Sequence, residues 1–285
     1  MQELRGMPVV HAMCEKMKED IEKLAIHGIV PTLAIVRVGE RADDLSYERG
    51  TIKRFTAAHA QVNVVNLPAD CTQSMLEEAV MDLNSDSNIH GILIFRPLPK
   101  HLSEDSLKKL IAPEKDVDCF SNAGYASLFI GDKSAYPPCT PQAVIELLDF
   151  YNIDVCGKKV TVLGRSLVVG KPLSIMLLAK NATVTVCHSK TQNLMGECKS
   201  ADILIASVGS AKMITAEYVH ENQIVIDVGI NMDGDKLCGD VDYENVSPIV
   251  KAITPVPGGI GTITTTVLLK HTVASAIMMQ NRKIL

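Results

Sequence analysis

The second half of the chain repeats one pattern that strongly constrains its fold. Four short runs of mostly apolar residues, at 159–163, 183–187, 203–207 and 224–228, are separated by stretches with helical periodicity. Strands that are apolar on both faces are typical of a parallel sheet covered by helices on its two sides. The pattern therefore predicts an α/β domain built around a buried parallel sheet.

The first half carries a looser version of the same alternation. Runs rich in β-branched residues at 32–38, 61–67 and 90–95 are each followed by a charged, amphipathic stretch, which predicts further βαβ units. A proline-rich segment at 136–141 then interrupts the pattern. We therefore expect two lobes, residues 1–140 and 141–264, and a C-terminal helix over residues 265–285 that packs back onto the first lobe.

Length and charge exclude several classes of protein. The chain has 285 residues, which favours two lobes, and its net charge of −5 with no basic cluster argues against nucleic-acid binding. No apolar run approaches the ~20 residues of a membrane span, and the first thirty residues are rich in charge, so we expect a cytoplasmic protein. The eight cysteines form no C-x-x-C pair, and we expect no metal site.

A glycine turn follows the first apolar run of the second half. Gly164 and Gly170 stand between that run and a helical stretch, where backbone N–H groups at a helix start can meet a pyrophosphate. The spacing is not G-x-G-x-x-G, so a simple tight turn remains an alternative. The pattern indicates a candidate dinucleotide site.

The end of the next run bears on the choice of cofactor. An NAD site usually places an acidic residue there for the ribose hydroxyls, but residues 187–191 read CHSKT. With no carboxylate present, Arg165, Ser189 and Lys190 could accept a 2′-phosphate. We therefore expect NADP and leave NAD open, with a solvated Lys190 as the simpler alternative.

Six ordered motifs resemble the methylenetetrahydrofolate dehydrogenase/methenyltetrahydrofolate cyclohydrolase family, and the resemblance covers nearly the whole chain. The motifs are KDVD (115–118), PCTP (138–141), GRS with VGKP (164–166 and 169–172), ATVTVCHS (182–189), GDVD (239–242) and TPVPGG (254–259). The resemblance implies an N-terminal folate-binding lobe, a Rossmann-like second lobe and a cleft between them. It also implies a homodimer built through the dinucleotide-binding lobes.

The resemblance also implies the chemistry and its residues. Hydride would pass from 5,10-methylenetetrahydrofolate to the nicotinamide, with Asp118 as the carboxylate that binds the pterin and Tyr47 as the ring that stacks on the folate. Further candidates for the folate are Phe95, Pro97, Pro255, Gly258 and Gly259. Candidates for the cofactor are Gly164, Arg165, Ser166, Gly170, Pro172, His188, Ser189, Lys190, Gly209 and Ile230.

The chain departs from the family where its second activity resides. Hydrolysis of the methenyl product uses a lysine four residues after the tyrosine and a nearby glutamine, but those positions are Thr51 and Phe95. Lys53 would lie about 240° around a helix from Tyr47, so it should point elsewhere unless the helix is distorted near Gly50. A threonine supplies no base at neutral pH, so we expect a divergent branch with weak or absent cyclohydrolase activity.

Two alternatives belong to other classes. A non-catalytic regulator could keep both binding sites while losing activity, but hydride transfer requires no group that this chain lacks. A dehydrogenase for a hydroxy acid or a shikimate-like substrate would need a Lys/Asp or His/Asp pair in the first lobe. The histidines there have no evident partner in the sequence.

Overall fold

The computed structural model describes residues 1–132 and 134–284. The chain divides into two compact units, one of residues 12–139 with 265–285 and one of residues 1–11 with 140–264. We call them the three-stranded unit and the six-stranded unit after their sheets. Three helices contain residues of both units: α1 (Gly6–Ile26), α6 (Cys139–Phe150) and α10 (Ile260–Ile284).

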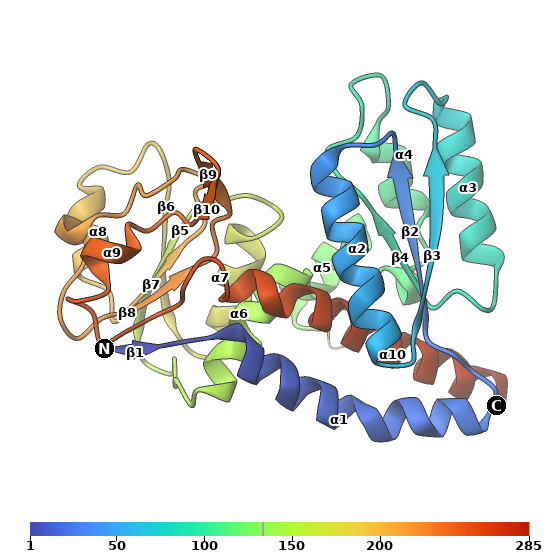
Figure 1. Ribbon diagram of the computed structural model, residues 1–285, viewed down its shortest axis with the longest axis horizontal. Helices are drawn as coiled ribbons and strands as arrows, with labels where there is room; N and C mark the ends of the chain where they lie inside the picture. Colours follow the sequence, from blue (N-terminus) through green and yellow to red (C-terminus); the bar gives the residue numbers. More distant parts are fainter. Residues whose placement is uncertain (133, 285) are drawn as a thin grey trace. The chain divides into compact units, whose positions relative to one another are not determined.

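The three-stranded unit is built on a parallel sheet in the order β3-β2-β4. Its strands are β2 (Thr32–Val38), β3 (Gln61–Leu67) and β4 (Gly91–Ile94). Its other helices are α2 (Ala42–Ala57), α3 (Gln73–Ser85), α4 (Glu104–Leu110), α5 (Asn122–Ile130) and a 3₁₀ turn at Pro113–Lys115. Every residue of β2 is buried, because a central strand is covered on both faces (Figure 1).

Helix α3 packs its apolar face against the three-stranded sheet. Leu76, Val80 and Leu83 recur at helical spacing and are buried in one apolar cluster with residues of β2 and β4. The helix begins after Thr72, whose side chain accepts a hydrogen bond from Met75 N, as expected of a helix N-cap. Local capping and apolar spacing therefore agree on the same element.

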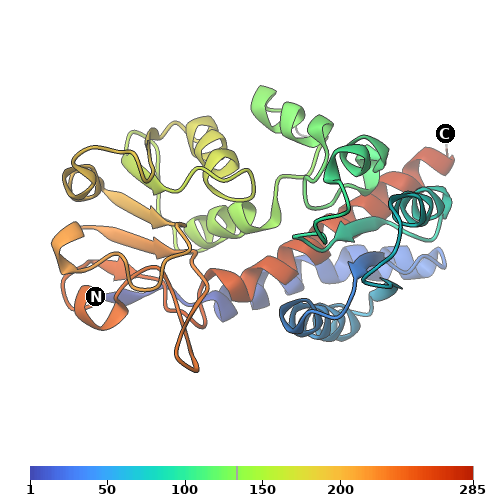
Figure 2. The same ribbon diagram turned by 90° about the horizontal axis from the view of Figure 1, so that it is seen from above.

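The six-stranded unit contains a parallel sheet in the order β1-β11-β8-β7-β5-β6. The strands are β1 (Gln2–Glu3), β5 (Lys159–Leu163), β6 (Thr183–Cys187), β7 (Ile203–Ala206), β8 (Ile224–Asp227) and β11 (Ala252–Ile253). Its remaining elements are α7 (Gly170–Ala179), α8 (Leu194–Lys199), a 3₁₀ turn at Ala216–Tyr218, α9 (Tyr243–Val246) and the hairpin of β9 (Asn231–Asp233) and β10 (Lys236–Cys238). The hairpin extends away from the sheet as an orange loop in Figure 2. The predicted α/β fold with a parallel sheet is confirmed.

One strand of this sheet differs from the expectation of burial on both faces. β6 lies at the edge of the sheet, and Thr183, Thr185 and Val186 are exposed. An edge strand has a neighbour on only one side, so its side chains are less completely covered. The apolar run predicted the strand but not its place in the sheet.

The start of the chain also differs from the predicted division at residue 140. Residues 1–11 belong to the six-stranded unit, because β1 pairs with β11 through hydrogen bonds of 2.8 Å from Gln2 N to Lys251 O and from Leu4 N to Ile253 O. A strand of two residues has no readable periodicity. The expectation that residues 1–11 belong to the first lobe is therefore wrong.

The C-terminal helix α10 begins at Ile260, before the position expected from its pattern. From residue 265 onward it belongs to the three-stranded unit, where Ser275 Oγ donates to Glu114 O at 2.7 Å and His271 Nδ1 lies 2.8 Å from Val117 O. The expected C-terminal helix is present. Across the described residues, no helix has both the length and the apolar character that a membrane span requires.

Candidate functional site

The carboxyl end of the three-stranded sheet carries the first group of predicted site residues. Phe95 directly follows β4, and Tyr47 lies on α2, the helix that follows β2. The two rings pack edge to face, with centroids 5.8 Å apart and planes at 70°. Ligands of open parallel sheets bind beyond the carboxyl ends of the strands, so this pair lies where a substrate would be expected.

An ion pair holds α2 against the end of β2. Arg37 Nε donates to Glu48 Oε2 at 2.9 Å, and the two side chains are only 7% and 13% exposed. Glu48 is the neighbour of Tyr47 on α2. A nearly buried pair with good geometry is sensitive to the loss of either partner, so it fixes the helix that presents the tyrosine.

Further along α2, Thr51 and Lys53 have opposite environments. Thr51 is fully buried, and its Oγ1 donates to Tyr47 O at 2.9 Å, while Lys53 is exposed. The helix runs without a break through Gly50, whose φ is not positive. The threonine hydroxyl is therefore engaged within its own helix, and Lys53 lies on the solvent side.

Asp118 is partly buried beside the backbone of Cys139. Its Oδ1 accepts a hydrogen bond from Cys139 N at 2.9 Å. Burial raises the pKa of Asp118 above its ordinary value, while this bond and the positive charge of Arg96 oppose the rise. Burial, with Cys139 and Asp118 nearby, raises the pKa of Tyr47 well above its usual range. Tyr47 therefore stays a neutral phenol beside a carboxylate.

Sequence reasoning missed the part that Cys139 plays, although the PCTP motif contained the signal. Its thiol lies 3.4 Å from Val117 O, and burial raises the pKa of the thiol well above its usual range. A buried neutral thiol behaves as a small apolar group. Cys139 thus helps to hold Asp118 through its backbone N–H and is not a nucleophile.

Arg96 lies over the Phe120 ring, with Cζ 5.2 Å from the ring centroid.

In the six-stranded unit, the predicted glycine turn follows β5. Gly164 has a φ of 112°, and a Cβ on it would lie 2.3 Å from Ser207 O. A Cβ on Gly170, the first residue of α7, would lie 2.1 Å from Gly164 O. Both positions require glycine because backbone segments approach each other closely there. Pro172 is buried in the first turn of α7.

A cavity of about 380 Å³ opens at the carboxyl ends of β5, β6 and β7. It is lined by the predicted cofactor residues Gly164, Arg165, Ser166, His188 and Ser189, together with Ser207, Val208 and Ser210 of the loop after β7. Arg165 and Ser189 are exposed, and none of the residues that line this cavity is acidic. Lys190 is exposed next to His188, whose Nδ1 accepts from Lys190 N at 3.1 Å.

The structure places the last predicted residues in a different cavity. Ile230 lines a space of about 210 Å³ with Pro255, Gly258 and Gly259, between the loop after β8 and the start of α10. Ile230 is thus grouped with predicted folate residues rather than with Arg165. The predicted folate residues are divided: Tyr47, Phe95, Pro97 and Asp118 belong to the three-stranded unit, and Pro255, Gly258 and Gly259 to the six-stranded unit.

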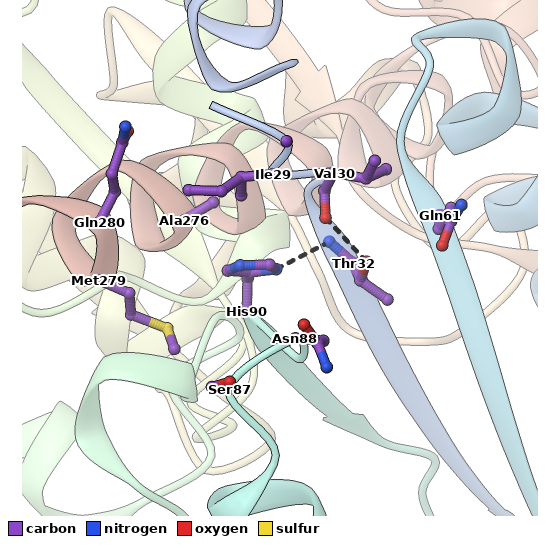
Figure 3. A pocket seen from close by; sticks show the side chains of 11 residues that line it. Ile29, Val30, Thr32, Gln61, Ser87, Asn88, His90, Ala276, Met279 and Gln280 are labelled. Carbon is purple, nitrogen blue, oxygen red and sulfur yellow. Dashed lines mark hydrogen bonds between the residues drawn. The ribbon is translucent and has the colours of Figure 1, made fainter. Parts of the chain in front are cut away.

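Another cavity, of about 280 Å³, lies at the amino ends of β2 and β3 (Figure 3). Thr32, Gln61 and His90 line it, and Thr32 N donates to His90 Nδ1 at 3.2 Å. No predicted site residue lies there. Within residues 1–132 and 134–284 no group of three or more His, Cys, Asp or Glu side chains could hold a metal ion.

Comparison with family models assigns the chain. Residues 4–118 match the catalytic domain of tetrahydrofolate dehydrogenase/cyclohydrolase, and residues 138–280 match the NAD(P)-binding domain of the same family. The chain belongs to this family. The resemblance inferred from the six motifs is confirmed at the level of the family.

Members of the tetrahydrofolate dehydrogenase/cyclohydrolase family resemble the chain over its full length. The bifunctional protein FolD of Clostridioides difficile is 52% identical over 98% of each chain. The structure of bifunctional FolD from Campylobacter jejuni superimposes with a TM-score of 0.95 at 38% identity, covering 99% of each chain. The Trypanosoma brucei FolD structure, a complex with NADP and an inhibitor, has a TM-score of 0.90 at 34% identity over 98% of this chain and 97% of that one.

Proposed function

We propose that the chain is an NADP-dependent methylenetetrahydrofolate dehydrogenase, which oxidises 5,10-methylenetetrahydrofolate to 5,10-methenyltetrahydrofolate. The observation that carries the proposal is the match of both halves of the chain to the two domains of one family. The cavity that follows β5 supports the choice of cofactor, because Arg165 and Ser189 line it and no acidic side chain does. An arginine can pair with a 2′-phosphate through two parallel hydrogen bonds.

The residues of the three-stranded unit fit the substrate side of this reaction. The Asp118 carboxylate accepts hydrogen bonds from the amino edge of the pterin, and the Tyr47 ring covers a face of the folate. Phe95 packs edge-on against Tyr47 and holds the orientation of that ring. Their role is to bind and orient, which is what a transfer between two positioned carbons needs.

NADP, when bound, supplies the hydride acceptor. The hydride leaves the methylene carbon, and the electron pairs of the adjacent folate nitrogens stabilise the methenyl cation, so no protein group takes a proton. Gly164 and Gly170 let the backbone segments of the turn after β5 approach each other closely, and this turn leads into the start of α7, the end of a helix that attracts a pyrophosphate. In this proposal the named residues of both units bind or position the two ligands, and none of them transfers a proton.

Hydrolysis of the methenyl product is weak or absent in this proposal. Thr51 stands where the family pattern has a lysine. Its hydroxyl is buried and donates to Tyr47 O, so it activates no water. Arg96 supplies positive charge near Asp118, but a guanidinium does not serve as a general base. The exposed Lys53 lies on the solvent side of the same helix.

The alternative of a non-catalytic regulator is not favoured, because the two solved structures described above are named as enzymes. We also propose that the chain forms a homodimer through its six-stranded unit. The apolar side chains of Ile230, Met232 and Leu237 are 63%, 59% and 41% exposed at and next to the hairpin. We also propose that the protein is located in the cytoplasm, as expected from the sequence.

The test is a steady-state absorbance assay of the purified chain with methylenetetrahydrofolate and either NADP or NAD. We expect reduction of NADP with a kcat/KM at least tenfold above that for NAD. A chain that binds both ligands but reduces neither dinucleotide would support the regulator. A preference for NAD would contradict the assignment of the cofactor.

A further inference from the structure

Two buried carboxylates in the six-stranded unit have no role in the proposed reaction. Asp227 ends β8 and is 3% exposed, and Asp240 follows β10 and is fully buried. A buried charge is costly unless it is paired or hydrogen-bonded. The hydrogen bonds of these two side chains therefore indicate what each of them holds.

Asp240 binds three consecutive backbone N–H groups of the loop that follows β7. Val208 N and Gly209 N donate to its Oδ2 at 2.6 and 3.1 Å, and Ser210 N donates to its Oδ1 at 2.9 Å. Asn231 Nδ2 adds a fourth bond at 2.9 Å. Charge-assisted bonds of this kind are about twice as strong as neutral ones. One side chain thus fixes the course of the whole loop.

Asp227 in turn holds the backbone around Asp240. Its Oδ1 accepts from Gly229 N at 2.9 Å and Asp240 N at 3.0 Å, and its Oδ2 accepts from Val241 N at 2.9 Å. The loop after β8 and the segment after β10 are therefore bonded to the same carboxylate.

Two glycines make this arrangement sterically possible. A Cβ on Gly239 would lie 1.9 Å from Asp227 Oδ2, and a Cβ on Gly229 would lie 2.3 Å from Asp240 Cγ. Asp227 therefore lies against Gly239, the neighbour of Asp240, and Asp240 lies against Gly229, two residues after Asp227. The sequences DVG (227–229) and GDV (239–241) form one interlocked unit.

The loop that Asp240 holds is a wall of the proposed dinucleotide cavity. Val208 and Ser210 line the same space as Gly164 and Arg165, and Gly209 between them has a φ of 68°. The three N–H groups of the loop donate to the Asp240 carboxylate. If this carboxylate were lost, those groups would need new partners, and the wall would shift.

We propose that Asp240 is a positioning residue for the dinucleotide: through three backbone N–H groups it holds residues 208–210 as a fixed wall of the cofactor cavity. The inference rests on the proposed function, because that function places NADP in this cavity. It assigns Asp240 no contact with the substrate. Its loss should therefore affect cofactor binding and leave folate binding unchanged.

The first test replaces Asp240 with asparagine, which keeps the size but directs an NH₂ group at N–H donors. In fluorescence titrations with NADPH we expect Asp240→Asn to raise Kd at least tenfold, while the KM for the folate at saturating NADP changes less than twofold. The matched control is Asp242→Asn, because the Asp242 carboxylate accepts a hydrogen bond at 2.7 Å from the exposed Asn245 side chain, whereas the N–H groups of residues 208–210 donate to Asp240. This control should keep the wild-type Kd.

A second measurement uses the wild type and does not depend on how well the variant folds. We expect the amides of residues 208–210 to be protected at least 100-fold against hydrogen exchange, although residues 209 and 210 are exposed. Unprotected amides, an unchanged Kd in Asp240→Asn, or equal losses for folate and NADPH would each overturn the inference. A wild type that binds no NADPH would instead contradict the proposed function.

Discussion

At the scale of single residues, the contribution of Asp118 to folate binding can be measured by substitution. Its carboxylate is partly buried and held by Cys139 N, and in our proposal it binds the amino edge of the pterin. Asp118→Asn replaces a charged acceptor with an amide that mismatches one donor, which should weaken folate binding by at least about 2 kcal/mol. Steady-state KM and direct titration of the folate measure this change.

The same residue predicts a pH dependence whose sign follows from burial. Because burial raises the pKa of Asp118, the carboxylate is protonated at a higher pH than an exposed aspartate would be. Folate affinity of the wild type should therefore fall as the pH falls through that raised pKa, and the Asn variant should lack this fall. A wild-type KM in Asp118→Asn would show that the residue does not bind the folate.

Arg165 tests the choice between the two dinucleotides. Arg165 is exposed and lines the cavity after β5. The two dinucleotides differ only in the 2′-phosphate, which NADP carries and NAD lacks. Arg165→Ala should raise the KM for NADP at least tenfold and the KM for NAD less than threefold, since an arginine pairs strongly with phosphate. Lys190→Ala, at the exposed lysine that follows Ser189, is the comparison. Equal losses with both dinucleotides would assign Arg165 to the shared pyrophosphate.

At the scale of elements, the regular course of α2 favours one of two hypotheses about hydrolysis, and the assay of the methenyl product tests it. The helix continues through Gly50, so Thr51 lies inside and Lys53 outside. We expect the wild type to hydrolyse the methenyl product at less than a hundredth of its rate of hydride transfer. The decay of the methenyl chromophore, corrected for the buffer rate, measures this ratio, and Lys53→Met should change neither activity.

Restoring hydrolysis should need two changes rather than one. A lysine at position 51 alone would put an ammonium group in a fully buried site, and a phenylalanine at position 95 offers it no hydrogen-bond acceptor. The double variant Thr51→Lys, Phe95→Gln is therefore the one expected to gain activity. Strong hydrolysis by the wild type that Lys53→Met abolishes would instead show that Lys53 acts as the base.

At the scale of the whole molecule, the exposed apolar residues at the hairpin predict that two copies of the chain associate there. Met232→Glu places a charge among Ile230 and Leu237, and we expect it to raise the dimer dissociation constant at least tenfold in sedimentation velocity. Lys236→Glu, a charge change on the same hairpin, is the matched control and should leave the constant within threefold. A wild type that sediments as a monomer at every concentration would contradict the proposed homodimer.

Patterns confined to a few neighbouring residues could be read from the sequence alone. Apolar runs predicted β5, β7 and β8, because a buried strand is apolar whatever its partners are. The motifs indicated the family for the same reason: residue types at fixed spacing are visible without a structure. They also marked Gly164 and Gly170 at the turn where the backbone segments prove to approach closely.

Contacts between distant residues were decided only by the tertiary structure. The edge position of β6 and the pairing of β1 with β11 depend on strands far apart in the chain, and a strand of two residues has no pattern of its own. The GDVD motif (239–242) was visible in the sequence, but its interlocking with residues 227–229 appears only in the structure, where Asp227 contacts Gly239 and Asp240 contacts Gly229. Hydrogen bonds and steric contacts of this kind depend on positions in space, which spacing along the chain does not specify.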